Sequence, residues 1–241
     1  MHAWLRGAAG TYGPRLISPL LDSMTWRLPP AAGRAVALTF DDGPTPHTGR
    51  LLEVLARFDV RATFFLLGRG VERHPREAAA IVNAGHEIAN HSWSHLSGWR
   101  ADMATLVREY RRTDAALQDL TGQPVRWVRP PYGTFTFPLI HWARRRGQRV
   151  AMWDTMPCDY SPHSRAAAVA AGIMKARPRS IVCLHDNAHS ASVTPEALWL
   201  ALPRLRDRGD RFVTLSGGIA AAENAAAPPP PVTRSAPPPR R

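Results

Sequence analysis

Cysteine is scarce in this sequence, and long apolar runs are missing. The 241 residues include two cysteines, Cys158 and Cys183, and neither belongs to a CxxC pair or a Cys/His cluster. This excludes a disulfide-rich scaffold and a cysteine-based zinc module. It leaves two thiols that we expect to be buried, with a single bridge as the alternative. No segment approaches the roughly 20 apolar residues of a membrane helix. Nucleotide-binding GxGxxG and GxxxxGK loops are also absent.

Acidic residues are outnumbered. The chain has 19 Asp plus Glu against 31 Lys plus Arg, which gives a formal net charge of +12. Such a balance favours anionic polymers, a negatively charged cell wall or a membrane surface. Nucleic acid is not expected as a partner, because most arginines are scattered over predicted helix faces, as in "HWARRRGQ", where charge runs are usually solvated.

The N-terminus lacks a clear secretion signal. Glycine, proline and a second arginine interrupt its apolar residues before a core of about 7 to 15 residues can form. We therefore expect a cytoplasmic or peripheral protein without a transmembrane segment, unless the N-terminus is atypical.

What the sequence does have is an alternation of short apolar runs and longer amphipathic ones, which is typical of parallel β/α units. The predicted strands are 35–40, 62–67, 86–90, 125–129, 149–153, 180–185 and 211–215. The predicted helices between them are 49–58, 75–85, 101–122, 137–147, 165–177 and 195–209. A closed barrel and an open doubly wound sheet both fit this pattern.

Composition divides the chain into three parts. Residues 1–34 form an N-terminal extension, and 35–220 form one α/β domain large enough for a substantial core. Residues 221–241 are rich in Pro, Ala and Arg and have little to bury, so we expect a disordered tail.

The stretch "LTFDDGPTP" ends an apolar run in two adjacent acids, Asp41 and Asp42. Aspartate, glycine and proline favour turns, so a solvated loop is the simplest interpretation. The alternative is a bound cation, which would let one carboxylate ligate while its neighbour accepts a proton.

Other polar side chains also stand at the ends of predicted strands. They are His91, His95, Arg129, Asp154, Asp159 and His185. In a β/α barrel the carboxyl ends of the strands form one face, so these side chains would converge on a common mouth. His91 and His95 are four residues apart, and two histidines with one carboxylate are a familiar ligand set for Zn²⁺ and related ions. This convergence favours the metal interpretation of the acidic pair.

The motifs "TFDDGP", "HSWSH", "RPPYG" and "LHD" resemble, in order and approximate spacing, those of the polysaccharide deacetylases. This is carbohydrate esterase family 4, with its NodB-homology domain. The connecting segments "DVRATFFLLG" and "AGHEIANHSWSH" also resemble the family, so the resemblance covers about residues 35–216. It implies a distorted (β/α) barrel of about seven parallel strands in a bacterial, zinc-dependent hydrolase.

The resemblance also implies roles for individual residues. Asp42, His91 and His95 would hold the metal, and Asp41 would be the base that takes a proton from metal-bound water. Zinc is the expected ion, with Co²⁺ or another divalent ion as the alternative. His185 would be the acid that protonates the departing amine.

Two further roles follow from the "RPPYG" motif. The resemblance implies that Arg129 pairs with the base aspartate and that the backbone N–H of Tyr132 stabilises the oxyanion.

The stretch "WDTMPCDY" departs from the family pattern. Tyr160 stands where many members have tryptophan, and Met156 stands where an acid is common. Asp154 or Asp159 is expected to orient Arg129 or His185, and the sequence does not choose between the two acids.

These observations predict a monomeric, metal-dependent hydrolase that removes N-acetyl or O-acetyl groups from a polysaccharide or oligosaccharide, with an anionic cell-wall polymer as one candidate substrate. A deformylase or esterase acting on a lipid-linked sugar or a non-sugar amide is one alternative. A non-catalytic glycan-binding barrel is another. A glycan substrate would place the protein at the cell envelope, against the expectation drawn from its N-terminus.

Overall fold

The computed structural model describes residues 24–226, with side chains up to residue 220. Within this part of the chain, eight strands form one sheet in which every strand pair is parallel. The strands are β1 (Met24–Thr25), β2 (Ala35–Asp41), β3 (Thr63–Leu66), β4 (Glu87–Asn90), β5 (Trp127–Val128), β6 (Arg149–Ala151), β7 (Ile181–His185) and β8 (Arg211–Phe212). Their order is β1-β6-β5-β4-β3-β2-β7, with β8 beside the start of β2.

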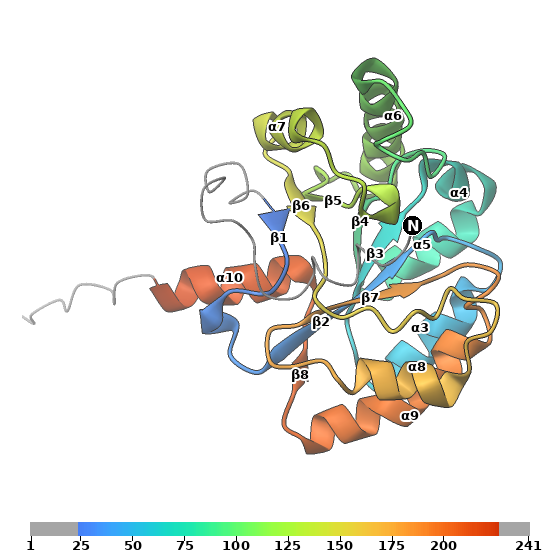
Figure 1. Cartoon of the computed structure of the whole chain (residues 1–241), viewed down its shortest axis with the longest axis vertical. Helices are drawn as coiled ribbons and strands as arrows, with labels where there is room; N and C mark the ends of the chain where they lie inside the picture. The colour runs from blue at the N-terminus through green and yellow to red at the C-terminus, as the bar shows by residue number, and fades with distance from the viewer. Residues whose placement is uncertain (1–23, 227–241) are drawn as a thin grey trace, which may run out of the picture.

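Helices lie outside the curled sheet (Figure 1). They are the 3-10 turns η2 (Pro30–Ala32) and η3 (Pro131–Gly133) and the α-helices α3 (Thr48–Arg57), α4 (Gly68–Arg73), α5 (Pro75–Asn83), α6 (Met103–Thr121), α7 (Phe137–Arg145), α8 (Ala166–Ile173), α9 (Val193–Asp207) and α10 (Leu215–Ala226). All seven residues of β2 are buried. A strand covered on both faces is expected to be a continuous apolar run, and "AVALTF" is one.

The sheet curls until its two edges meet. Arg27, just after β1, forms an antiparallel bridge with Ser180, just before β7. Thr155, after β6, bridges to Val182 of β7. An open doubly wound sheet would keep its edge strands apart, so this closure confirms the distorted barrel of about seven parallel strands.

Asp154 holds this seam together. Its Oδ1 accepts a hydrogen bond from the Ile181 N–H at 3.0 Å, and its Oδ2 accepts one from the Ser180 hydroxyl at 3.0 Å. The Nε of Arg27 lies 2.9 Å from the same Oδ2. The carboxylate therefore ties the segments that flank the two edge strands.

Helix α10 covers the amino ends of the central strands. The Leu215 N–H donates to Thr63 Oγ1 at 3.0 Å, and the Ser216 N–H donates to Glu87 Oε2 at 3.2 Å. The indole N–H of Trp127 donates to Ser216 Oγ at 2.9 Å. Thr63, Glu87 and Trp127 are the first residues of β3, β4 and β5, so α10 closes the side of the barrel opposite the strands' carboxyl ends.

Apart from the two 3-10 turns, three elements of the described residues were not in the sequence prediction. Strand β1 and helices α4 and α10 were not predicted, and α10 carries the chain through residues 221–226, which composition assigned to the tail. Residues 1–23 of the expected extension and 227–241 of the expected tail lie outside the described residues.

The two cysteines do not form a bridge. Both are free, with Cys183 buried in β7 and Cys158 exposed in the loop that follows β6. The expectation of burial was therefore wrong for Cys158. No helix in residues 24–226 is long and apolar enough to cross a membrane.

Candidate active site

The acidic pair leaves β2 with its two side chains in different surroundings. Asp41 is the last residue of the strand and only 4% exposed. Asp42 follows in the left-handed region, with φ of 76°. This backbone turn separates the carboxylates, so that Asp41 meets a guanidinium while Asp42 meets two imidazoles. Aspartate tolerates this conformation better than most residues.

Asp42, His91 and His95 form a set of three ligand atoms, which lie within 4.8 Å of one another. Asp42 Oδ1 is 3.1 Å from His95 Nε2 and 3.6 Å from His91 Nε2. The Nδ1–H of His91 donates to the Arg129 carbonyl at 2.8 Å, which leaves its Nε2 lone pair facing the carboxylate. Asp42 Oδ1 is buried and has no hydrogen-bond partner among the described residues.

The ionisation of this set suits a cation. Burial alone would raise the pKa of Asp42, but the contact with His95 and the charges of His91 and His185 outweigh it and hold the pKa well below its usual range. Burial is the main cause that lowers the pKa of His91, which keeps the imidazole neutral. A carboxylate and a neutral imidazole are the forms that bind a metal ion, so these residues fit one.

Arg129 is completely buried beside the base candidate. One of its terminal nitrogens donates to Asp41 Oδ1 and to Thr39 Oγ1, both at 2.7 Å. Its other N–H groups donate to the carbonyls of Ala151 at 3.2 Å and Met152 at 3.0 Å. The guanidinium is thereby fixed, and it fixes Oδ1 of Asp41, while Oδ2 accepts only a long hydrogen bond, 3.4 Å, from the Cys183 thiol.

Tyr132 lies at the mouth next to the ligand set. Its ring meets the His95 ring edge to face, with 4.4 Å between centroids, and the residue is 65% exposed. Its φ of 59° is unusual for a residue other than glycine. Pro130 and Pro131 precede it with restricted φ, so the backbone of this loop has few alternatives near the site.

His185 ends β7 and is oriented by Asp159. Its Nδ1 and Asp159 Oδ1 are 2.8 Å apart, and its backbone N–H donates to Asp159 Oδ2 at 2.8 Å. Thr194 donates to the same Oδ2 at 2.6 Å. Burial alone would lower the pKa of His185, but the hydrogen bond and charge of Asp159 raise it to about 9. His185 is therefore an imidazolium at neutral pH and can donate a proton.

The structure brings together most of the residues that the sequence singled out. Asp41, Asp42, His91, His95, Arg129, Tyr132, Asp159 and His185 all lie at the carboxyl ends of β2, β4, β5 and β7 or in the loops that line this mouth. Asp154 does not join them, because its contacts lie at the seam of the sheet.

Three residues near the site were missed. Asn187 donates to Asp42 Oδ2 at 2.8 Å. Asp186 accepts from Thr48 at 2.6 Å and lies so close to Gly43 that a Cβ there would be 2.5 Å from its carboxylate. The position of both directly after "LH" was the available signal. Cys183 donates to Asp41 Oδ2 at 3.4 Å, and nothing in the apolar run "IVCLH" marked it.

Comparison with known proteins identifies the family of this chain. The polysaccharide deacetylase family model matches residues 29–151. A peptidoglycan-N-acetylglucosamine deacetylase of Bacillus cereus is 31% identical over 80% of this chain and 91% of its own length. A chitooligosaccharide deacetylase of Rhizobium leguminosarum bv. trifolii is 34% identical over 73% of this chain and 87% of its own length. Across seven such relatives, the match takes in between 38% and 91% of their own lengths.

Solved structures show the same fold. A peptidoglycan N-acetylglucosamine deacetylase, in complex with a naphthalenyl N-oxidanyl-benzamide, superimposes with a TM-score of 0.78 at 29% identity, covering 82% of this chain and 93% of its own. A pseudoenzyme of the CE4 family from Bacillus anthracis superimposes with a TM-score of 0.73 at 28% identity, covering 80% and 67%. The fold thus occurs with and without activity, whereas the curated relatives are named as deacetylases. The chain therefore belongs to the polysaccharide deacetylase family and is an enzyme of the class that hydrolyses carbon–nitrogen bonds.

Proposed function

We propose that the protein hydrolyses the N-acetyl group of an amino sugar in a glycan and that a divalent metal ion, most simply zinc, is required. The observation that carries this proposal is the unpartnered Oδ1 of Asp42 facing two imidazole Nε2 atoms, directly beside an aspartate fixed by a buried arginine. A divalent ion held by Asp42, His91 and His95 supplies Lewis-acid chemistry, which acidifies a water and polarises the acetyl carbonyl.

Asp41 is the base in this proposal. Arg129 occupies its Oδ1, and Oδ2 lies 4.0 Å from Nε2 of the ligand His91. Oδ2 therefore faces the space in which a water must sit to attack a carbonyl. The proton moves from that water to Oδ2, while the oxygen forms a bond to the acetyl carbon.

The backbone N–H of Tyr132 is the proposed oxyanion donor. A donor fixed before the reaction stabilises developing charge without having to reorganise, and the left-handed turn at Tyr132 between Pro131 and Gly133 provides such rigidity. The phenol ring against His95 would bring the same residue over the reacting group.

His185 is the proposed acid. Asp159 holds its Nδ1, which leaves Nε2 to protonate the amine nitrogen as the carbon–nitrogen bond breaks. The products are acetate and a free amino sugar. Asp41 and His185 sit side by side in the register of β2 and β7, so base and acid approach the scissile group from adjacent strands.

The substrate class is proposed from relatives and charge. The named relatives act on peptidoglycan or chitooligosaccharides, and the net charge of +12 favours an anionic wall polymer over a neutral oligomer. We therefore propose peptidoglycan as the preferred glycan and the cell envelope as the place of action.

The test is acetate release from peptidoglycan, N-acetylglucosamine oligomers and acetylated xylan, with zinc-loaded and chelated protein. Asp41→Asn is expected to retain zinc and to lose about 10²- to 10⁴-fold in kcat, as the removal of a general base does. Asp42→Asn is expected to lose the zinc itself. Asp59→Asn, at a side chain that is 90% exposed, is the matched control and should match the native rate.

The alternatives give different results. Free hydroxyl groups among the products would identify an esterase instead of an amidase. Formate among the products would identify a deformylase. Glycan capture that survives chelation, without acetate from any substrate, would make the barrel a binding module and end the catalytic proposal.

A further inference from the structure

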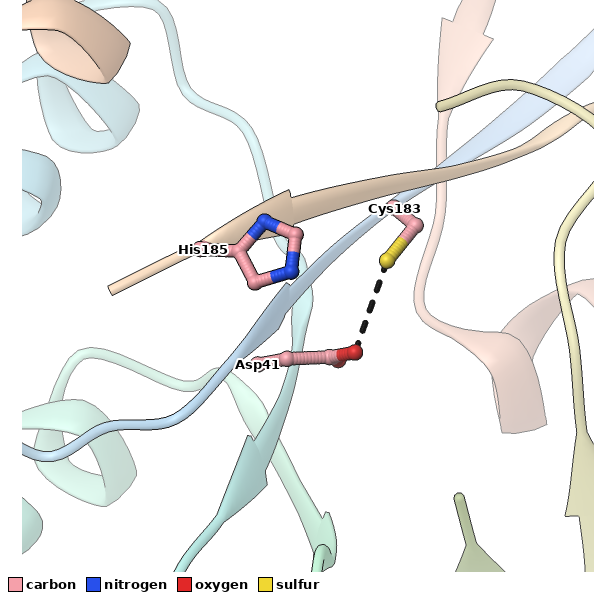
Figure 2. A group of neighbouring side chains, drawn as sticks. All are labelled: Asp41, Cys183 and His185. Atoms are coloured by element: carbon pink, nitrogen blue, oxygen red, sulfur yellow. Dashed lines mark hydrogen bonds between the residues drawn. The ribbon is translucent and has the colours of Figure 1, made fainter. Parts of the chain in front are cut away.

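A second set of potential metal ligands lies beside the first. Asp41, Cys183 and His185 bring three ligand atoms within 4.8 Å of one another. They come from β2 and β7, whose register places Asp41 opposite His185 and Thr39 opposite Cys183. Residues two apart on a strand point the same way, so the thiol and the imidazole both reach the carboxylate. Figure 2 shows the three side chains around one space.

One separation in this set matches that of a zinc site. Cys183 Sγ and Asp41 Oδ2 are 3.4 Å apart. A tetrahedral zinc ion, with bonds of about 2.3 Å to sulfur and about 2.0 Å to oxygen, separates those two atoms by about 3.5 Å. His185 is held on its Nδ1 by Asp159 at 2.8 Å, which is how metal-binding histidines are commonly oriented. The free Nε2 of His185 is the third ligand atom.

We infer that Asp41, Cys183 and His185 bind a second, thiophilic divalent ion when such an ion is in excess, and that this ion inhibits the enzyme. On binding, the thiol proton and the imidazolium proton pass to solvent, and bonds form from the metal to sulfur, nitrogen and Oδ2. The inhibition rests on the proposed function, because the ion occupies the base and the acid. The binding itself does not.

The second site should be weaker than the first. Asp41 already accepts hydrogen bonds from Arg129 and from the Cys183 thiol, so a metal must displace one of them and tolerate the guanidinium 2.7 Å from Oδ1. Asp42 Oδ1 has no such competitor among the described residues. The first equivalent of metal therefore goes to Asp42, His91 and His95. Ligand softness then sets selectivity for the second, so Zn²⁺, Cd²⁺ and Co²⁺ bind while Mg²⁺ and Ca²⁺ do not.

Cobalt absorption separates the two sites without any activity measurement. The Asp/His/His set contains no sulfur, so the first equivalent of Co²⁺ should give visible ligand-field bands alone. Further Co²⁺ should add a near-ultraviolet thiolate-to-cobalt charge-transfer band. Cys183→Ser should lack this band and retain the ligand-field bands, with Cys183→Ala as a second variant should the serine fold poorly. Cys158→Ser removes the exposed thiol and is the matched control, which should keep the band.

Zinc inhibition gives the second readout. Each protein is compared with its own rate at one equivalent of zinc, and the zinc concentration that halves that rate should rise more than about tenfold in Cys183→Ser but not in Cys158→Ser. Three results would overturn the inference: no charge-transfer band in the native protein, a band lost in Cys158→Ser instead, or equal zinc inhibition in all three proteins. A band that depends on Cys183 in a protein releasing no acetate would keep the second site and refute only the proposed function.

Discussion

Two aspartates follow β6, and they make different contacts in the structure. Asp159 holds the proposed acid through Nδ1 and the backbone N–H of His185. Asp154 holds Ser180, Ile181 and Arg27 at the seam. Replacing each with asparagine should therefore change different properties of the enzyme, although the residues lie five positions apart.

Asp159→Asn should shift the alkaline limit of activity. The acid must carry a proton, and native His185, with a pKa of about 9, keeps it until the pH approaches that value. Without the Asp159 charge the pKa falls, so the decline of kcat should begin at lower pH, with a loss of about 10- to 100-fold at the optimum. The measurement is kcat across neutral and alkaline pH. If kcat of the variant declined at the same alkaline pH as kcat of the native enzyme, His185 would not be the acid.

Asp154→Asn is the companion variant. It should lower the free energy of unfolding by about 1 to 3 kcal/mol, because an amide has only one acceptor oxygen and no charge, so some of the donors that now share the two carboxylate oxygens lose their acceptor. Its alkaline limb should match the native one, and chemical denaturation provides the measurement. A shifted limb in this variant would instead connect Asp154 to the site.

Sequence reasoning at this scale reached the residues whose type and position both carry a signal. Asp41 and His185 end strands, and Asp42, His91 and His95 lie one to five residues after a strand, so the predicted ends of the strands located all five. The choice between Asp154 and Asp159 depended on the path of a loop, which has no period. Cys183 was predicted to be buried, but its contact with Asp41 was not predicted, because a buried thiol in an apolar run resembles an ordinary small apolar residue.

At the scale of the element, strands and long helices were predictable because the burial of one face spaces their apolar residues regularly along the sequence. The seven predicted strands all occur, although β5 and β8 shrink to two residues each. Strand β1 is also two residues long and could show no pattern. Helix α10 has the sequence "LSGGIAAAENAA", whose glycines and alanines gave no polar face to contrast with an apolar one.

The start of β4 predicts a pH dependence of stability. His86 is 7% exposed, and its Nδ1 accepts a hydrogen bond from the Ala62 N–H at 3.2 Å. Burial, followed by the charge of Arg61, lowers its pKa from 6.5 to about 4. Between about pH 4 and pH 6.5, His86 is protonated in the unfolded chain and neutral in the folded chain. This contribution to stability is therefore complete above about pH 6.5 and is lost as the pH falls to about 4.

The size of this contribution is at most about 3 kcal/mol. It is measured by urea unfolding at a series of pH values. His86→Asn keeps an acceptor for Ala62 without a titrating ring, so its stability should fall less steeply over the same range. Equal slopes for the two proteins would assign the acid sensitivity to other groups.

At the scale of the whole molecule, the metal set and the hydrogen bond from Asn187 to it connect three distant parts of the chain. Asp42 follows β2, His91 and His95 follow β4, and Asn187, which donates to Asp42 at 2.8 Å, follows β7. An ion bound by this set stabilises the folded state alone, by about 2.7 kcal/mol when its concentration is 100 times the dissociation constant. Zinc should therefore raise Tm and chelation should lower it.

Asp42→Asn is the control for this thermal shift. At one equivalent of zinc its Tm should match the Tm of the chelated variant, because the variant lacks one ligand of the set. A zinc-dependent Tm of native size in Asp42→Asn would place the stabilising ion elsewhere. Scanning calorimetry or circular dichroism with and without zinc makes the comparison.

Helix α10 lies under the amino ends of the strands, on the opposite side of the barrel from the carboxylates and imidazoles. An affinity tag joined at the C-terminal end of this helix would start on the side of the barrel that lies away from the candidate active site. The protein could then be immobilised on a bead or fused to a glycan-targeting module through that end, with its open mouth still presented to an insoluble sheet of polymer.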